Sequence, residues 1–301
     1  MDKQDRLNGY GLVWGSQNKV MGWYDGLSAP VHLGRFGRND YHNHITSVAF
    51  IDGSLMSAGY DQKIRNVLSQ EEVHSFNGPL SGLTEADGKM IAIEGIDNHN
   101  PAKVFNVKTG KEIYQINPQG PSPKEGLSFR CINGLVSDGN SLYVSSENII
   151  RIKPSFEGTE VEKVTEYMSD FAYIASNGAK VFSAHYHNSG SNPDGTELRI
   201  MPDNKRVAFL SIGEEEECNR YPQLFALVGD KAVMGFSNHR SEEHNLYSFD
   251  ITDEMLKSTN GIKVEPTLLL KNAYKGAKTY GACNPITAVP KDALEKIIEN
   301  I

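Results

Sequence analysis

The sequence predicts an all-β fold, a six-bladed β-propeller, from three observations. Short apolar runs alternate with two-residue turns of the kind that joins the strands of a hairpin. The turns recur at roughly 35–50 residues, the period of one four-stranded blade. The N-terminal segment lacks one of the four strands of a blade, and a strand near the C-terminus can supply it. The ring can therefore close without a free sheet edge. The turns are Asp52-Gly53, Asp87-Gly88, Asp138-Gly139, Asn177-Gly178 and Gly229-Asp230.

Aligned on these turns, five segments each begin with an inner strand and supply a whole blade. The segment from about His44 to Phe76 is the clearest, and its four expected strands are Ile45–Phe50, Ser54–Ala58, Lys63–Val67 and Glu72–Phe76. A seventh blade is the alternative, if one of the two longest intervals contains two merged blades. The other segments are Ser81–Asn117, Ile132–Val164, Phe171–Leu210 and Gln223–Leu270.

The two ends of the chain are expected to build the remaining blade together. The N-terminal segment supplies strands at Gly11–Gly15, Lys19–Tyr24 and Pro30–Leu33, and it lacks an inner strand. Ile286–Val289 resembles Ile45–Val48 and is expected to pair with Gly11–Gly15. The prediction is therefore one domain over residues 1–301, closed by its terminal strands.

A short amphipathic helix is expected at about residues 291–301. Leu294, Ile297, Ile298 and Ile301 fall at helical spacing, and Asp292 is placed to cap the first turn. Because this helix follows an inner strand, it should emerge on the face that carries the hairpin turns. It should pack over the channel or the first blade there.

Two blades resemble a WD40 repeat. The segment His44-Ile45-Thr46-Ser47-Val48-Ala49-Phe50, followed by Ser57-Ala58-Gly59-Tyr60-Asp61-Gln62-Lys63-Ile64-Arg65, is similar to such a repeat, with Asp61 in the turn between the second and third strands. Leu12 to Val20 with Trp23-Tyr24-Asp25 is a weaker match. The resemblance implies a propeller that binds partners, and we expect Asp61 to accept hydrogen bonds in its turn.

The composition excludes several classes of partner. The chain has 301 residues, 39% of them hydrophobic, and a formal net charge of -8. An acidic protein does not favour nucleic acid or an anionic membrane. No apolar run reaches the roughly 18 residues that span a bilayer, and three cysteines do not make a disulfide framework. We therefore expect a cytoplasmic protein with no nucleic-acid or membrane partner.

Candidate binding residues gather in enlarged second-to-third-strand loops and in the segments between blades, which open on one face of a propeller. Neutral imidazole binds metals, and the planar guanidinium of arginine fits carboxylate or phosphate. A face of this kind therefore suits a peptide or an anionic ligand, and a metal is the less favoured alternative. The candidate residues are His44, His99, Arg130, His185, His187, Arg220, His239 and Arg240.

Two hypotheses of function follow. The first is an intracellular binding or scaffold propeller that engages a protein or a small anionic ligand through the face rich in histidine, arginine and asparagine. The alternative is a propeller enzyme, a hydrolase or lyase with possible metal assistance, in which His185, His187 or His239 acts as acid, base or ligand. No phosphate-binding loop or nucleophile elbow appears in its required context, and we expect no cofactor and no bound metal.

Overall fold

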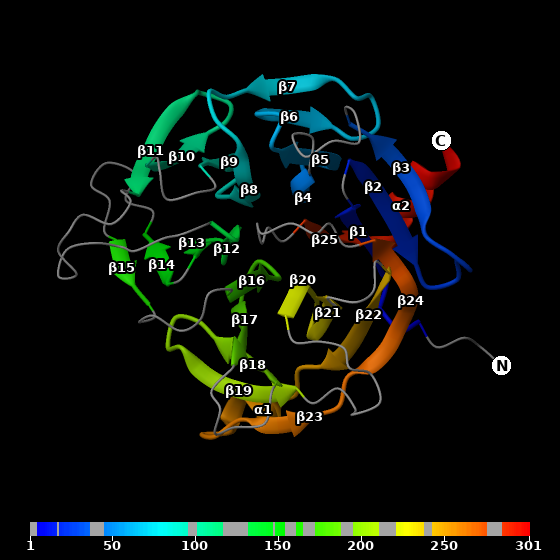
Figure 1. Cartoon of the computed structure of the whole chain (residues 1–301), viewed down its shortest axis with the longest axis vertical. Helices are drawn as coiled ribbons and strands as arrows, with labels where there is room; N and C mark the ends of the chain where they lie inside the picture. Colours follow the sequence, from blue (N-terminus) through cyan, green and yellow to red (C-terminus); the bar gives the residue numbers. More distant parts are fainter. Residues whose placement is uncertain are drawn as a thin grey trace.

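The chain forms six β-sheets arranged as blades around a central axis, and this confirms the count of six over seven (Figure 1). The structure is a computed structural model. It describes residues 5–16, 18–36, 45–95, 101–116, 132–146, 148–153, 161–164, 172–187, 195–210, 221–237, 243–275 and 285–301.

Blade 1 joins the two ends of the chain, as the sequence predicts. Its strand order is β25-β1-β2-β3, and β25 pairs antiparallel with β1. The backbone amide of Gly15 also donates to the carbonyl of Pro285 at 2.7 Å. The strands are β1 (Tyr10–Ser16), β2 (Lys19–Tyr24), β3 (Val31–Arg35) and β25 (Ile286–Pro290).

Blades 2 to 4 are consecutive four-stranded meanders, and the predicted strands of blade 2 are confirmed to within one residue. Blade 2 contains β4 (Ile45–Ile51), β5 (Ser54–Gly59), β6 (Lys63–Asn66) and β7 (Glu72–Ser75). Blade 3 contains β8 (Leu80–Ala86), β9 (Lys89–Glu94), β10 (Ala102–Asn106) and β11 (Lys111–Ile116). Blade 4 contains β12 (Gly134–Ser137), β13 (Leu142–Ser145), β14 (Ile149–Ile152) and β15 (Val161–Lys163).

Blades 5 and 6 are linked by an additional strand. Blade 5 contains β16 (Ala172–Ser176), β17 (Val181–His187), β18 (Gly195–Ile200) and β19 (Lys205–Leu210). Blade 6 contains β20 (Tyr221–Val228), β21 (Lys231–Ser237), β22 (Glu243–Asp250) and β24 (Thr267–Lys275). Between β22 and β24 the chain forms α1 (Asp253–Lys257) and β23 (Ile262–Val264), and β23 pairs in parallel with β19. Blade 5 therefore has five strands, and β23 covers the edge of β19.

Two of the hairpin turns between first and second strands have the two-residue backbone that their residues predict. Asp52 and Gly53 have φ of 49° and 73°, and Asp87 and Gly88 have φ of 51° and 64°. Two successive positive φ values define the turn that matches the twist of paired strands, and Asp-Gly suits it because neither residue strongly resists that conformation. At Asp138-Gly139 and Asn177-Gly178 only the glycine has a positive φ and four residues join the strands, so the expected two-residue turn is wrong there.

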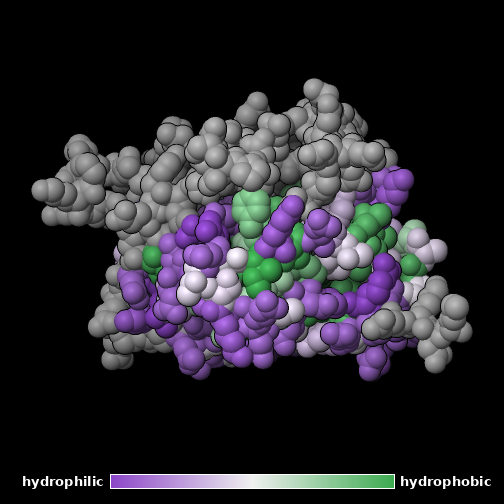
Figure 2. Space-filling view, turned by 90° about the horizontal axis from the view of Figure 1, so that it is seen from below, coloured by the Kyte–Doolittle hydropathy of each residue, from purple (hydrophilic) through white to green (hydrophobic). Residues whose placement is uncertain are grey.

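The core lies between neighbouring blades. The largest cluster packs blade 5 against blade 6 through side chains such as Phe182 and Phe225. A second cluster packs blade 6 against blade 1, and it includes Leu7 and Trp14, both fully buried. Figure 2 shows one edge of the ring, where the described surface is mostly hydrophilic with smaller hydrophobic areas between.

The C-terminal helix α2 (Lys291–Glu299) packs on blade 1, the second of the two expected positions. Leu294 is fully buried and joins a cluster with Val13, Val20 and Val289. The expected cap is absent: the N-cap residue is Pro290 and no side chain caps the helix, so Asp292 lies in the first turn without a capping bond. Its charge there still favours the positive end of the helix dipole.

Candidate functional site

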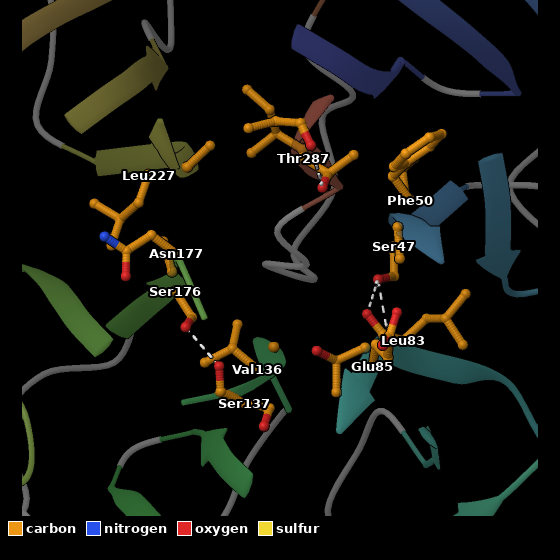
Figure 3. Close-up of a pocket in the computed structure, with 18 of the residues that line it drawn as sticks. Ser47, Phe50, Leu83, Glu85, Val136, Ser137, Ser176, Asn177, Leu227 and Thr287 are labelled. Carbon is orange, nitrogen blue, oxygen red and sulfur yellow. Dashed lines mark hydrogen bonds between the residues drawn. The ribbon is translucent and has the colours of Figure 1, made fainter. Parts of the chain in front are cut away.

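A cavity of about 350 Å³ lies on the axis, where residues of all six inner strands converge (Figure 3). The inner strands are β25, β4, β8, β12, β16 and β20. Its lining also includes the turn residues Asn177, Gly178 and Gly229. The cavity therefore extends along the channel to the end where the inner strands turn into the second strands. Ser81, Gly134 and Ile286, near the first residues of their strands, also line it. Its volume is at the lower end of the range for small-molecule sites, about 300–1,000 Å³.

Serine and threonine side chains on the inner strands bind the blades to one another. Thr46 Oγ1 on blade 2 donates to the carbonyl of Leu80 on blade 3 at 2.5 Å. Ser47 Oγ accepts the backbone amide of Leu83 at 3.0 Å. Because inner strands of adjacent blades share no backbone ladder in the described sheets, these hydroxyls provide polar links between blades 2 and 3.

The same arrangement links blades 4, 5 and 6. Ser176 Oγ donates to the carbonyl of Ser137 at 2.5 Å and accepts the amide of Gly178 at 2.9 Å. Asn177 Nδ2 donates to the carbonyl of Gly229 at 2.9 Å. Much of the polar lining therefore already has hydrogen-bond partners within the ring.

Glu85 differs from its polar neighbours in the cavity. It lies on β8 and lines the cavity (Figure 3), and it is exposed. Among the described lining residues it is the single side chain with a formal charge. This end of the channel is therefore neutral to acidic.

Most of the sequence-predicted site lies outside the described residues. These positions are His44, His99, Arg130, Arg220, His239 and Arg240. The backbone of His187 is described as the last residue of β17. The proposed gathering of these side chains on one face therefore stays a prediction.

His185 is described, and it is a buried residue of β17. Its side chain is 1% exposed, and its Nε2 lies 2.6 Å from Oγ of Ser183, which is fully buried. Its neighbours across the sheet are Ala172 on β16 and Glu197 on β18. The pattern His-Tyr-His at the start of a polar segment suggests a loop, but the strand continues through it because each residue to His187 pairs with β18.

Glu197 is the centre of a buried ionic cluster on β18 and β19. Glu197 is 3% exposed, and its Oε2 accepts hydrogen bonds from Nε and Nη2 of Arg199 at 3.0 and 2.8 Å. Its Oε1 accepts Nη1 of Arg206 at 2.9 Å. Burial alone would raise the pKa of Glu197, but the hydrogen bonds from both arginines outweigh it and hold the pKa below the ordinary value. The carboxylate therefore stays ionised and stabilises the blade.

Neither the cavity nor this cluster has the donor set of a metal site. In the part of the chain that the structure describes, no group of three or more His, Cys, Asp or Glu side chains could hold a metal ion. Within the same residues, neither helix is long and apolar enough to cross a bilayer.

Sequence reasoning missed Glu85 as a residue of the channel. In Leu83-Thr84-Glu85-Ala86 it reads as the solvent side of an alternating strand. The signal that could have found it is its position two residues before Asp87-Gly88, because inner-strand residues next to these turns line the end of the channel.

Comparisons with known proteins support the propeller arrangement. No family model matches the chain, and no curated protein matches it. The structure is similar to that of TolB from Acinetobacter baumannii, with a TM-score of 0.57 and 13% identity over 94% of this chain and 67% of that one. It is also similar to a protein of unknown function from Bacteroides caccae, with a TM-score of 0.58 and 13% identity over 93% of this chain and 99% of that one. At this identity the likeness shows the fold alone, so this chain shares the propeller arrangement of these proteins.

Proposed function

We propose that the protein is a cytoplasmic binding propeller, which engages a protein or a small anionic ligand through His44, His99, Arg130, His187, Arg220, His239 and Arg240; His185, which is 1% exposed, is left out of this set. The closed six-bladed ring supports the proposal, because its hydroxyl links and interblade cores make a rigid platform on which loops carry the activity. The low cysteine content is consistent with the cytoplasm.

The likeness of blades 1 and 2 to WD40 repeats belongs to the same proposal. The turn between β5 and β6 supports it, because Asp61 lies in that turn as the resemblance implies. Its carboxylate accepts a hydrogen bond from Nε of Arg65 at 3.2 Å. A partner-binding role is what the resemblance adds to the fold.

The proposal is tested by anion binding. Thermal unfolding of the wild type would be followed with inorganic phosphate, citrate and a Glu-rich peptide, and then repeated for Arg130→Ala and Arg220→Ala. We expect at least one anion to raise the melting temperature and each variant to weaken binding about tenfold or more, because a charge-assisted hydrogen bond contributes about 1.5–3 kcal/mol. Arg35→Ala is the matched control, since Arg35 is exposed on β3.

The result distinguishes a protein partner from a small anionic ligand, and it can also reject the proposal. A larger shift with the peptide than with phosphate or citrate supports a protein partner, and the reverse supports a small ligand. Equal anion shifts in wild type, Arg130→Ala and Arg220→Ala would reject this binding face.

The enzyme alternative rests on one specific observation, the 2.6 Å contact between Ser183 Oγ and His185 Nε2. A serine within reach of a histidine is the geometry of nucleophilic catalysis. The exposures of both side chains, 0% and 1%, count against direct contact with a substrate. Metal analysis of protein purified without a histidine tag, together with ester hydrolysis by wild type and Ser183→Ala, distinguishes an enzyme from a binding module.

A further inference from the structure

One end of the channel lies at the hairpin turns between the first and second strands, and we call it the turn end. Its charged residues are mostly acidic, whereas the proposed anion-binding residues are basic. The inner strands and turns around it carry Asp52, Glu85, Asp87, Asp138 and Asp230. Lys89, Lys180 and Lys231 are the cations of the same strand ends and turns, and each is already paired. Lys89 lies 2.6 Å from Asp87, Lys180 lies 3.4 Å from Asp230, and Lys231 pairs with Asp250. The potential at this mouth is therefore negative, which favours a cation.

Part of the donor capacity at the turns is not offered to an anion. An anion needs N–H or O–H donors, but the hydroxyl of Ser176 and one N–H of the Asn177 amide already donate within the ring. Glu85, in contrast, presents a carboxylate that can accept two parallel bonds from a planar guanidinium or one from an ammonium.

Aromatic residues elsewhere in the cavity lining suit the carbon part of such a ligand. Tyr10 lines the cavity from β1 with 37% of its surface exposed, and Phe50 lines it from β4 while also packing against the cluster of blade 1 and α2. Aromatic rings bind organic cations through both apolar contact and the ring quadrupole. The cavity of about 350 Å³ can accommodate a short side chain or a small amine.

We propose that the turn end of the channel is a second binding site, which takes an organic cation, a guanidinium or an alkylammonium group, with Glu85 as its charged partner. The cation would come either from an arginine or lysine side chain of a partner or from a free amine. This site is independent of the anion-binding residues of the proposed function, because its named residues are Glu85, Phe50 and Tyr10.

The test compares cationic probes with neutral probes of the same shape by isothermal titration calorimetry on the whole chain. Ethylguanidinium and N-ethylurea form the first pair. A Gly-Arg-Gly peptide with blocked ends and the same peptide with citrulline form the second. We expect the cations to bind, the ureas not to bind, and Glu85→Gln to weaken cation binding about tenfold or more through loss of the charge-assisted bond.

Glu112→Gln is the matched control. It removes a carboxylate of the same blade that lies on the outer strand β11, away from the channel, and whose side chain is 41% exposed and paired with Lys103. Wild-type affinity in this variant supports a specific site at Glu85. Tighter binding of the peptide assigns the cation to a partner chain, and tighter binding of ethylguanidinium assigns it to a small molecule. Binding that is unchanged in Glu85→Gln, or equal for cation and urea, overturns the proposal, and so does absence of binding by both cations.

Discussion

Leu12 on β1 pairs with Ala288 on β25, so residues 276 positions apart in the chain are neighbours in one sheet. Five pairs from Tyr10–Pro290 to Trp14–Ile286 make up this ladder. It closes the ring, because the inner strand of blade 1 would otherwise be missing. The stability of the whole propeller therefore depends on its last residues.

The first prediction is that deletion of residues after Asn284 unfolds or aggregates the protein. The deletion removes β25 and α2, exposes the edge of β1, and uncovers buried side chains such as Val13 and Leu12. Size-exclusion chromatography and thermal melting of the truncated chain test this. A truncated protein that melts like the full chain would contradict closure by β25.

A smaller change isolates the packing of α2. Leu294 is fully buried against blade 1, and a Cβ placed on Gly11 would lie 2.4 Å from its Cδ2. Leu294→Ala should lower the free energy of unfolding by about 2–5 kcal/mol, the range for a buried leucine that leaves a cavity. Urea unfolding measures the loss. Ile301→Ala is the control and should have little effect, because Ile301 is 64% exposed; similar losses in both variants would contradict a packed helix.

The fold could be predicted from local patterns because dipeptides such as Asp-Gly are characteristic of hairpin turns. Asp52-Gly53 and Asp87-Gly88 both adopt positive φ, in two different blades, and the spacing of such dipeptides along the chain predicts the blade count. Ile286–Val289 could be placed because it repeats the pattern of Ile45–Val48. These are properties of a few consecutive residues.

The features that were missed depend on distant contacts. Ile262–Val264 is too short to read as a strand, and it becomes β23 because β19, more than 50 residues earlier in the chain, offers an open edge. The position of Glu85 also depends on distant parts of the chain, because it lines the channel only where the six inner strands converge. The positions of the predicted site residues were harder to infer, because histidines and arginines in loops follow no periodic spacing from which the placement of their side chains could be deduced.

The role of Asp61 gives a prediction on the WD40 likeness. The sequence suggests a buried carboxylate whose loss costs about 1–3 kcal/mol. In the structure its bonded partner is Arg65, and the side chains are 23% and 24% exposed. We therefore expect Asp61→Ala to lower the free energy of unfolding by about 0.2–1 kcal/mol, the range for partly exposed ion pairs.

Arg65→Ala and the double variant complete the test of this pair. If the pair accounts for the effect, the double variant should lose no more stability than either single variant. A loss above about 1 kcal/mol in Asp61→Ala alone would show bonds in the turn like those that the WD40 resemblance implies. Chemical denaturation of the four proteins gives these differences.

The last prediction concerns the pH dependence of stability at Glu197. Hydrogen bonds from Arg199 and Arg206 hold the pKa of Glu197 below its unfolded value. The folded state therefore binds this proton less readily than the unfolded state. The resulting stability is present above the unfolded pKa and is lost as the pH falls through the folded pKa.

Glu197→Gln should be less stable than wild type at neutral pH, because both arginines lose their charged partner, and the difference in the free energy of unfolding should narrow from about pH 5 toward pH 3. Urea unfolding at several pH values measures it. Glu265→Gln is the control, since Glu265 is exposed and should follow the wild-type curve. A difference between Glu197→Gln and wild type that stays constant with pH would mean that Glu197 acts through shape and hydrogen bonding rather than through its charge.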